Sequence, residues 1–281
     1  MTAPNSPLPI ADAPEPLEPA LEPLLDASFD YSAAADGLAT AAPLRARLLQ
    51  RLQASKAASA GMVTARAARL PRQALAPGVQ RRELYRMPAG RPARPGEPRR
   101  AGLISLDAGA VLPSYGDSAL QREWLVLQGE VLIDGIALAA RDYHVCLPRQ
   151  ASGGISSAAG ALLFVRESLQ PAAASDQALT VYDAEAGWAD FAPGIQRRVL
   201  WQQDGQAALL YYAQPGAQVP QHRHGHDEEC LMVQGELFLD DVLLQAGDYQ
   251  LAPAGTGHQI TATDTGVVIY AHGDLELQFT G

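Results

Sequence analysis

The sequence APGVQRREL at residues 76–84 returns as APGIQRRVL at residues 192–200, a match that chance would hardly produce. The second halves of the two units also match, since EWLVLQGE at residues 123–130 corresponds to ECLMVQGE at residues 229–236. From about residue 61 onward, short runs rich in Leu and β-branched residues are broken by Gly, Pro and Asp-Gly, which is typical of β-sandwiches and β-barrels. The sequence therefore predicts an all-β protein made of two related, tandem barrels.

The repeat and the composition together predict three regions. Residues 1–60 are expected to form an acidic, Pro-rich tail and a short amphipathic helix, because residues 1–36 hold seven acidic side chains and no Lys or Arg. Pro43 can open that helix, which either packs on its own barrel or docks on a partner. A first barrel is expected over residues 61–172 and a second over residues 173–281.

The bulk numbers limit the classes of function. A formal net charge of −10 over 281 residues repels phosphate backbones, so a protein or a small molecule is a better partner than nucleic acid. No apolar run approaches the roughly 18 residues of a transmembrane helix. The first 25 residues carry acidic residues and prolines where a secretory signal needs an apolar run, so we expect a cytoplasmic protein.

Four of the six histidines lie between residues 222 and 258. From Gly216 the spacing is G-x5-H-x-H-x3-E-x6-G, and G-x5-P-x-G-x2-H follows and ends at His258. Side chains two residues apart on a strand share a face, so His222 and His224 can both point into a barrel. A turn and a second hairpin can bring Glu228 and His258 to the same interior. Three imidazoles and one carboxylate suit a divalent metal, with zinc favoured and iron, manganese or nickel as alternatives.

The neighbours of these residues receive weaker expectations. His226 is expected to face solvent rather than to act as a fifth donor. Asp227 and Glu229 are expected outside the ligand set, where they can orient the imidazoles. Cys230 is expected to fill the core rather than to serve as a redox thiol, since no nearby charge lowers its pKa. With Cys146 it makes neither a CxxC pair nor a disulfide pattern, and both are expected to be buried, reduced thiols.

The first copy serves as an internal control for the metal site. Alignment of the repeats places Tyr115, Asp117, Arg122 and Ser152 at the four ligand positions. Arg122 would repel a cation and can instead pair with Asp117, so we predict that the first barrel binds no metal and supports the second. A small-ligand pocket is the alternative. This copy also carries an insertion, Arg86 to Arg100, expected to be a solvated hairpin loop, with a docking patch as the alternative.

The two spacings around the histidines look like the two cupin motifs, lacking only the Asn that often closes the second. More narrowly, PGVQRREL, PGIQRRVL, HRHGHDEECLMVQGE and GDYQLAPAGTGH resemble the cupin domain of ChrR-type anti-sigma factors, twice over, across about residues 61–281. The resemblance implies a double-stranded β-helix, the jelly-roll barrel of cupins, in each half. It also carries the ligand roles of that family onto His222, His224, Glu228 and His258.

That family further implies a partner. Its amino-terminal domain, with a zinc-binding H-x3-C-x2-C motif, sequesters a sigma factor, and the cupin domain helps to release it under oxidative stress. In this sequence no His precedes His144 and no Cys precedes Cys146, so that zinc motif is missing. Residues 42–49 nevertheless resemble the segment that follows the anti-sigma domain. We therefore expect a cupin module with a shortened front end, and sigma-factor binding is not assured.

Two functions are compatible with the same set of ligands. A regulatory sensor would bind metal with little turnover and pass a signal to a protein partner, as in anti-sigma-like control of transcription. A metal-dependent dioxygenase acting on a small diketone or aromatic substrate would instead consume oxygen. We favour the sensor, and the sequence identifies no catalytic residue.

Overall fold

A computed structural model describes the chain at residues 45–47, 49–50, 53, 61–117, 119–148, 154–169 and 179–280. The six described residues between 45 and 53 are helical, and the rest of the expected tail and helix lies outside the described residues. The chain divides into two units, Met1–Gln53 and Ala54–Gly281, and both barrels belong to the second unit. In the described part of the chain no helix is long and apolar enough to cross a membrane.

The first barrel follows a short edge strand, β1 (Val63–Ala65), and a single turn of 3-10 helix, η2 (Ala67–Arg69). Its strands are β2 (Gln73–Ala76), β3 (Val79–Arg86), β4 (Pro98–Leu106), β5 (Val111–Leu112), β6 (Gln121–Ile133), β7 (Ile136–Ala139), β8 (Tyr143–Cys146), β9 (Ile155–Ser156) and β10 (Ala161–Ser168). The strand β11 (Leu179–Val181) follows and leads into the second copy.

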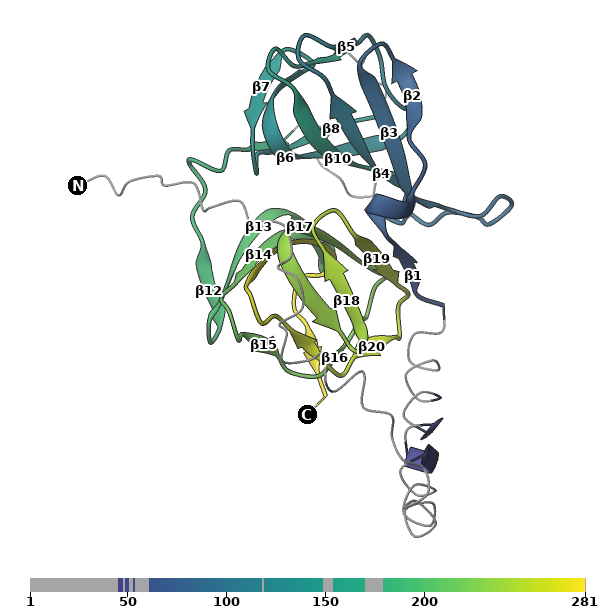
Figure 1. Ribbon diagram of the computed structural model, residues 1–281, viewed down its shortest axis with the longest axis vertical. Coiled ribbons are helices and arrows are strands. Elements are labelled where there is room, and N and C mark those ends of the chain that lie inside the picture. The colour runs from purple at the N-terminus through teal and green to yellow at the C-terminus, as the bar shows by residue number, and fades with distance from the viewer. Residues whose placement is uncertain are drawn as a thin grey trace, which may run out of the picture. The chain divides into compact units, whose positions relative to one another are not determined.

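The second barrel repeats this order with small additions. Its strands are β12 (Ala189–Ala192), β13 (Ile195–Gln203), β14 (Gln206–Ala213), β15 (Gln218–Val219), β16 (His222–Arg223), β17 (Glu228–Leu239), β18 (Val242–Gln245), β19 (Tyr249–Ala252), β20 (Gly257–His258), β21 (Thr261–Ala262), β22 (Val267–Asp274) and β23 (Gln278–Phe279). Figure 1 shows the two barrels, the first in blue and teal and the second in green and yellow.

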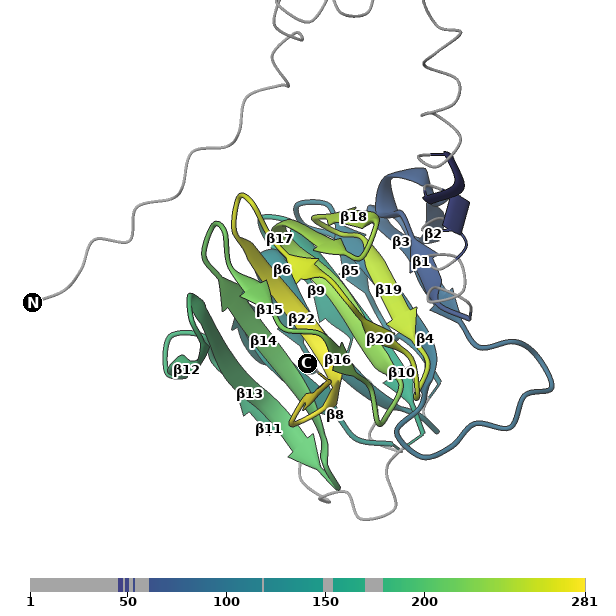
Figure 2. The same ribbon diagram turned by 90° about the horizontal axis from the view of Figure 1, so that it is seen from below.

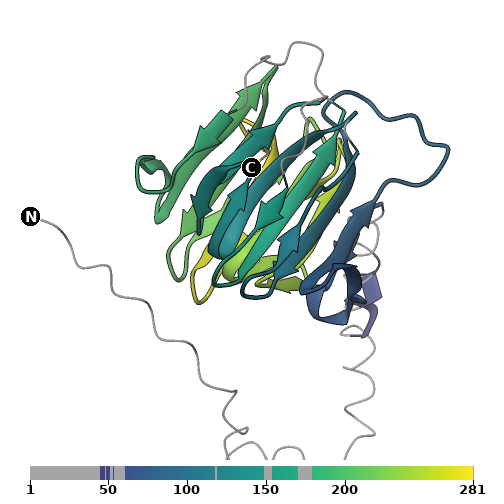
Figure 3. The same cartoon turned by 90° about the horizontal axis from the view of Figure 1, so that it is seen from above.

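The two barrels have the same antiparallel topology. The main sheet of the first runs β11-β8-β6-β10-β4-β3-β2, and that of the second runs β1-β19-β17-β22-β14-β13-β12. Figure 2 shows the strands of the second sheet side by side, and Figure 3 shows those of the first from the other side. The predicted tandem double-stranded β-helix is confirmed.

At one edge of each main sheet, the outermost strand comes from the part of the sequence that forms the other barrel. Strand β1, which precedes the first barrel, pairs with β19 of the second, where Thr64 lies opposite Gln250. Strand β11 falls within the expected second domain, yet it pairs with β8 of the first barrel through Thr180 and His144. Each barrel therefore has, at one edge, a strand from the segment next to the other barrel. This pairing covers a sheet edge that would otherwise be unpaired.

The glycine of the repeated QGE sequence explains why that motif recurs. Gly129 and Gly235 both have φ at 77°, a left-handed conformation that favours glycine. A Cβ there would meet the carbonyl oxygen of Gly160 at 2.2 Å and that of Gly266 at 2.1 Å. Both positions therefore require glycine, for the backbone angle and for the close approach of the neighbouring strand.

Among the described residues, buried apolar side chains form three clusters, one more than the number of barrels. One fills the first barrel around Trp124 and Ile104, and another fills the second around Met232 and Leu244. The third joins the two sheets and combines residues of both barrels, including Leu103, Leu125, Phe164, Leu210, Leu231 and Tyr270. The facing sheets share this core, so each barrel buries an apolar face that would be exposed in isolation.

Candidate metal centre

The four predicted ligands come from neighbouring strands of the second barrel. His222 on β16 and His258 on β20 lie directly opposite each other in an antiparallel pair. His224 follows β16, and its backbone exchanges hydrogen bonds with the turn before β20, since its N–H donates to the Thr256 carbonyl at 2.9 Å. Glu228 is the first residue of β17. Arg223 is exposed between two buried histidines, as strand alternation predicts.

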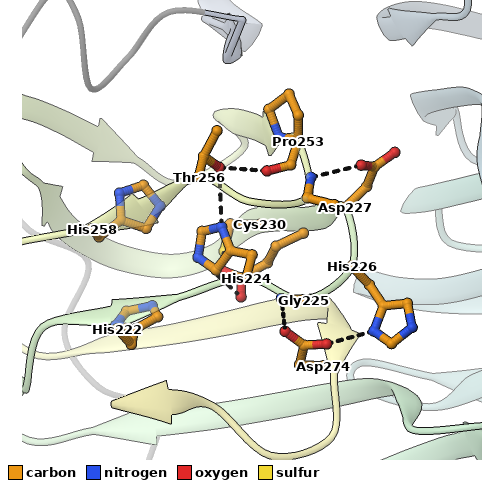
Figure 4. A network of polar contacts seen from close by, with 12 residues as sticks. His222, His224, Gly225, His226, Asp227, Cys230, Pro253, Thr256, His258 and Asp274 are labelled. Atoms are coloured by element: carbon orange, nitrogen blue, oxygen red, sulfur yellow. Dashed lines mark hydrogen bonds and ion pairs between the residues drawn. The ribbon is translucent and has the colours of Figure 1, made fainter. Parts of the chain in front are cut away.

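The side chains converge at one end of the barrel interior, as Figure 4 shows for the imidazoles. The ring centroids are 5.3 Å apart for His222 and His224, 5.1 Å for His224 and His258, and 5.8 Å for His222 and His258. His224 Nε2 lies 3.6 Å from Glu228 Oε2. One ligand atom from each of His222, His224 and Glu228 lies within 4.8 Å of the others, whereas His258 borders this group by ring contact.

Each imidazole is held through its Nδ1 atom. That atom lies 3.0 Å from the Pro220 carbonyl oxygen in His222 and 3.2 Å from Asp240 Oδ2 in His258. In His224 it lies 3.3 Å from Thr256 Oγ1, a hydroxyl that itself donates to the Pro253 carbonyl and so accepts from the ring. Nδ1 is thereby the protonated nitrogen, and Nε2 is left with a lone pair for a metal, as metal-binding histidines require.

The donor set passes a direct test of whether it fits a metal. His224 Nε2 is fully buried and has no hydrogen-bond partner among the described residues. A buried ring nitrogen without a partner costs free energy, and a bound cation would remove that cost. His222, His224 and Glu228 therefore form a compact donor group whose chemistry matches a divalent ion, with His258 at its border.

The electrostatic environment shifts the pKa of two of the predicted ligands. Burial lowers the pKa of His224, and this effect outweighs the Glu228 carboxylate, which raises it. Burial alone would raise the pKa of Glu228, but the neighbouring histidines and the hydrogen bond from Cys230 outweigh burial and hold that pKa below its usual value. Both shifts favour the form of the side chain that coordinates a cation.

A small apolar cavity of about 60 Å³ adjoins the ligands inside the second barrel. His222 and Glu228 form its polar end, and its apolar wall includes Phe191, Ile195, Leu209, Leu237, Leu239 and Ile269. Cys230 also lines it, and its thiol donates to Glu228 Oε1 at 3.3 Å. Burial and the charge of Glu228 raise the pKa of Cys230 well above its usual value, so the thiol stays protonated.

The residues between and beside the ligands point elsewhere. His226 turns away from the centre, and its Nδ1 pairs with Asp274 (Figure 4). Asp227 accepts hydrogen bonds from the Ala254 N–H and from Arg94. Glu229 alternates away from Glu228 as expected and lies in the contact between the barrels. The imidazoles are oriented by Pro220, Thr256 and Asp240, and not by Asp227 or Glu229 as the sequence suggested.

Asp240 is the supporting residue that sequence reasoning missed. It lies at the tip of the β17–β18 hairpin with φ at 54°, and its Oδ1 also accepts the N–H groups of Gln259 and Ile260. Its equivalent in the first copy is Asp134, which has φ at 51° in the β6–β7 hairpin. The Asp-Gly and Asp-Asp turns were visible in the sequence, but nothing local showed that one of them reaches a histidine 18 residues away.

The equivalent place in the first barrel holds different chemistry. Arg122 is buried and donates from Nη1 to the Tyr115 carbonyl at 2.8 Å. The expected pairing of Arg122 with Asp117 is wrong among the described residues, because Asp117 instead accepts the Ala119 N–H at 2.8 Å. Trp124 stands at the position of Cys230 and packs edge-on against Tyr115, with ring centroids 5.2 Å apart. Ser152 lies outside the described residues, and the absence of metal here stays a prediction.

Comparisons with solved structures identify the fold. The chain matches YlbA from Escherichia coli at a TM-score of 0.59 and 14% identity, covering 76% of this chain and 93% of that one. It matches the bacterial pirin YhhW from E. coli, solved in complex with nickel(II), at 0.57 and 11%, covering 76% and 99%. It matches the oxalate decarboxylase of Lactobacillus farciminis, a formate complex, at 0.54 and 11%, covering 77% and 87%. At these identities the likeness concerns the fold alone.

No curated protein matches this sequence. A family model described as the ChrR cupin-like domain matches residues 176–276, a range that contains the four predicted ligands and every residue that lines the cavity except Leu277. The match agrees with the resemblance seen in the sequence motifs. Residues 176–276 are therefore a cupin domain of the ChrR type.

Proposed function

We propose that this protein is a metal-binding regulator of the cytoplasm whose second barrel holds a divalent ion and passes a signal to a protein partner. The observation that supports it most is the arrangement of the four side chains. The three imidazoles are each held at Nδ1, and the buried Nε2 of His224 has no hydrogen-bond partner among the described residues. His222, His224, Glu228 and His258 are the proposed ligands.

Zinc is the proposed ion. The four side chains would offer three nitrogen donors and one oxygen donor, which are donor types that zinc accepts in proteins. Iron, manganese and nickel accept the same donors and remain the alternatives. A bound zinc would act as a Lewis acid and as a rigid cross-link between β16, β17 and β20, and the protein would supply orientation of the rings and exclusion of water.

The size of the cavity favours the regulatory function over an enzyme for aromatic substrates. The space beside Glu228 is about 60 Å³. An apolar cavity that encloses benzene measures about 150 Å³. An aromatic or diketone substrate therefore needs the wall of the barrel to open, whereas a molecule of a few atoms fits the space as it is.

A metal-dependent dioxygenase is the second candidate. The observation that favours it is the position of the cavity, which ends directly on His222 and Glu228 and so gives a small molecule access to the ion. This candidate predicts oxygen uptake by the iron-loaded protein in the presence of a small diketone. The regulatory proposal predicts no uptake above that of the His222→Ala variant.

Copurification from cells tests the regulatory proposal. The wild-type chain and His222→Ala, each confirmed as folded, would be recovered with their bound partners and compared. We expect a partner whose recovery changes at least several-fold between the two, and a sigma factor is the partner that the ChrR resemblance suggests. Equal recovery of every partner, together with oxygen uptake by the wild type alone, would establish the enzyme instead.

A further inference from the structure

The first barrel contacts the residues on both sides of Glu228. Asp227 is paired with Arg94, and Glu229 is paired with Arg166, so both arginines belong to the first barrel and both carboxylates to the second. The proposed ligand therefore lies between two residues that side chains of the first barrel hold from outside. This arrangement gives the first barrel a function beyond covering a sheet.

Arg166 is the more deeply placed of the two arginines. Its side chain is 2% exposed and lies between Glu123 of its own barrel, at 2.8 Å from Nη1, and Glu229 of the second barrel, which accepts from Nε. Its remaining nitrogen, Nη2, donates to the Gly96 carbonyl in the inserted loop. Tyr249 adds a second hydrogen bond to Glu229 at 2.7 Å. The start of β17 is thus held by a buried network of charge-assisted hydrogen bonds.

Arg94 acts from the insertion that the second copy lacks. Glu97 holds this loop in place by accepting the Arg94 N–H at 2.9 Å and the side chains of Arg91 and Arg94. From there Arg94 Nη2 reaches Asp227 Oδ2 at 3.2 Å. The other oxygen of Asp227 accepts the Ala254 N–H at 2.8 Å, in the turn that leads to His258. Asp227 therefore ties the loop to both segments that carry ligands.

Side chains bridge a gap between the inserted loop and the turn at residues 225–227, which lies between His224 and Glu228. A cavity of about 140 Å³ lies there, lined by Arg94, Glu97, Arg166, His226 and Asp227. Truncation of Arg94, whose side chain is 65% exposed, would therefore leave no new hole in a packed core. Most residues from 88 to 95 are exposed, in agreement with the expected solvated loop, whereas Gly96 and Glu97 at its end are buried and fix it in place.

We propose that the first barrel is a positioning device for the metal centre of the second, in which Arg94 and Arg166 fix Asp227 and Glu229 and thereby hold the Glu228 carboxylate in place for the ion. The proposal rests on the metal-binding function proposed above. It predicts that loss of either contact weakens metal binding without removing any ligand.

The first test uses two arginines of the same insertion. Arg94→Ala removes the pairing with Asp227, whereas Arg86→Ala, at the start of the insertion, removes only a pairing with Glu83 and serves as the matched control. Zinc affinity, measured by competition with a chromophoric chelator, is expected to fall about two- to fivefold in Arg94→Ala and to stay unchanged in Arg86→Ala. Arg94→Lys should restore most of the affinity. Equal affinities in Arg94→Ala and Arg86→Ala would contradict the role of the loop.

The second test separates positioning from stability. Arg166→Lys keeps the buried charge but loses hydrogen bonds, and Arg198→Lys is a control with similar burial whose partners, Asp183, Ala186 and Gly187, lie away from the ligands. Both variants should lose stability, but only Arg166→Lys should lose about tenfold in metal affinity and change the visible spectrum of the cobalt-substituted protein. An unchanged spectrum and affinity in Arg166→Lys would overturn the proposal.

The two proposals fail in different ways. If the wild-type chain and His222→Ala both bind no metal, the metal-binding function itself is wrong, and the positioning role falls with it. If the wild type binds metal and His222→Ala does not, while Arg94→Ala and Arg166→Lys bind like the wild type, the metal site stands and the positioning role alone is wrong.

Discussion

At the residue scale, the centre depends on the oxygen atoms behind the imidazoles as much as on the ligands. Asp240 holds His258 through Nδ1, and burial, which alone would raise its pKa, is outweighed by hydrogen bonds from His258, Ile260 and Gln259 that lower it. An ionised Asp240 fixes the tautomer and the orientation of the His258 ring. His258 is the one proposed ligand outside the compact group of three, so its orientation matters most.

Asp240→Asn should weaken metal binding about tenfold, because an amide holds the ring more weakly than a carboxylate does. The Asn side chain tolerates the left-handed backbone at this position, so the fold should persist. Asp134→Asn, in the equivalent hairpin of the first barrel, is the control and should leave affinity unchanged. The measurement is a zinc competition titration, and equal affinities in both variants would argue against the assigned role of Asp240.

Gly273→Ala should also weaken metal binding. A Cβ at Gly273 would lie 3.2 Å from both Cβ and Cγ of Glu228, closer than ordinary contact, so the carboxylate must shift. We expect a loss of affinity of severalfold, together with a loss of about 1–3 kcal/mol of unfolding free energy from overpacking. Gly187→Ala, where nothing lies within 4 Å, is the control. Unchanged affinity in Gly273→Ala would show that Glu228 is not held where the ion needs it.

At the element scale, strand alternation accounts for what the sequence could and could not predict. His222 and His224 flank an exposed Arg223, so the period of two placed them on one face correctly. The pairing of β16 with β20, which brings His258 opposite His222, joins segments 36 residues apart and leaves no local pattern. The contacts of Asp240, Thr256 and Gly273 are of the same long-range kind, which explains why they were missed.

The QGE glycines predict a strong effect at this scale. Gly235→Ala should lower the unfolding free energy by at least about 2 kcal/mol, since the residue would need a left-handed backbone and would meet the Gly266 carbonyl oxygen. Gly129→Ala should behave alike, because the same geometry recurs in the first barrel. Urea denaturation measures both. A cost below about 0.5 kcal/mol in either variant would contradict the claimed equivalence of the two glycines.

At the scale of the whole molecule, the barrels are joined by a shared apolar core, by two exchanged edge strands and by a buried charge network. The sequence repeat predicted two barrels correctly, but it gave no sign of the exchange. The reason is that β1 and β11 are three-residue strands whose pairing depends on which edge is available in space.

The shared core predicts that the two barrels unfold together. Calorimetry of the metal-free protein should show a single unfolding transition for the two barrels, with equal calorimetric and van 't Hoff enthalpies. The reason is that neither barrel can unfold without exposing the apolar cluster that the two sheets share. Separate transitions for Trp124 in the first barrel and Trp201 in the second, followed by fluorescence of single-tryptophan variants, would refute this.

His272, which lies beside Glu123 in the contact between the two barrels, makes the stability of the protein depend on pH. Burial and the nearby Arg166 lower the pKa of His272 to about 3, whereas an unfolded chain protonates this residue near 6.5. Between these values the unfolded state binds more protons, so stability falls as pH falls, by at most about 1.4 kcal/mol per pH unit. In His272→Gln, the unfolding free energy should therefore fall less steeply between pH 6.5 and 5 than in the wild type. Urea denaturation at several pH values measures this slope. The same slope in both proteins would exclude His272 as its source.

The most direct test of the central claim is elemental analysis of the protein purified without chelators, compared with His222→Ala confirmed as folded by circular dichroism. The account predicts about one divalent ion per chain in the wild type, most of it zinc, and almost none in the variant. A wild type without bound metal, or a variant that retains as much as the wild type, would contradict the claim that these three imidazoles and one carboxylate form a metal centre.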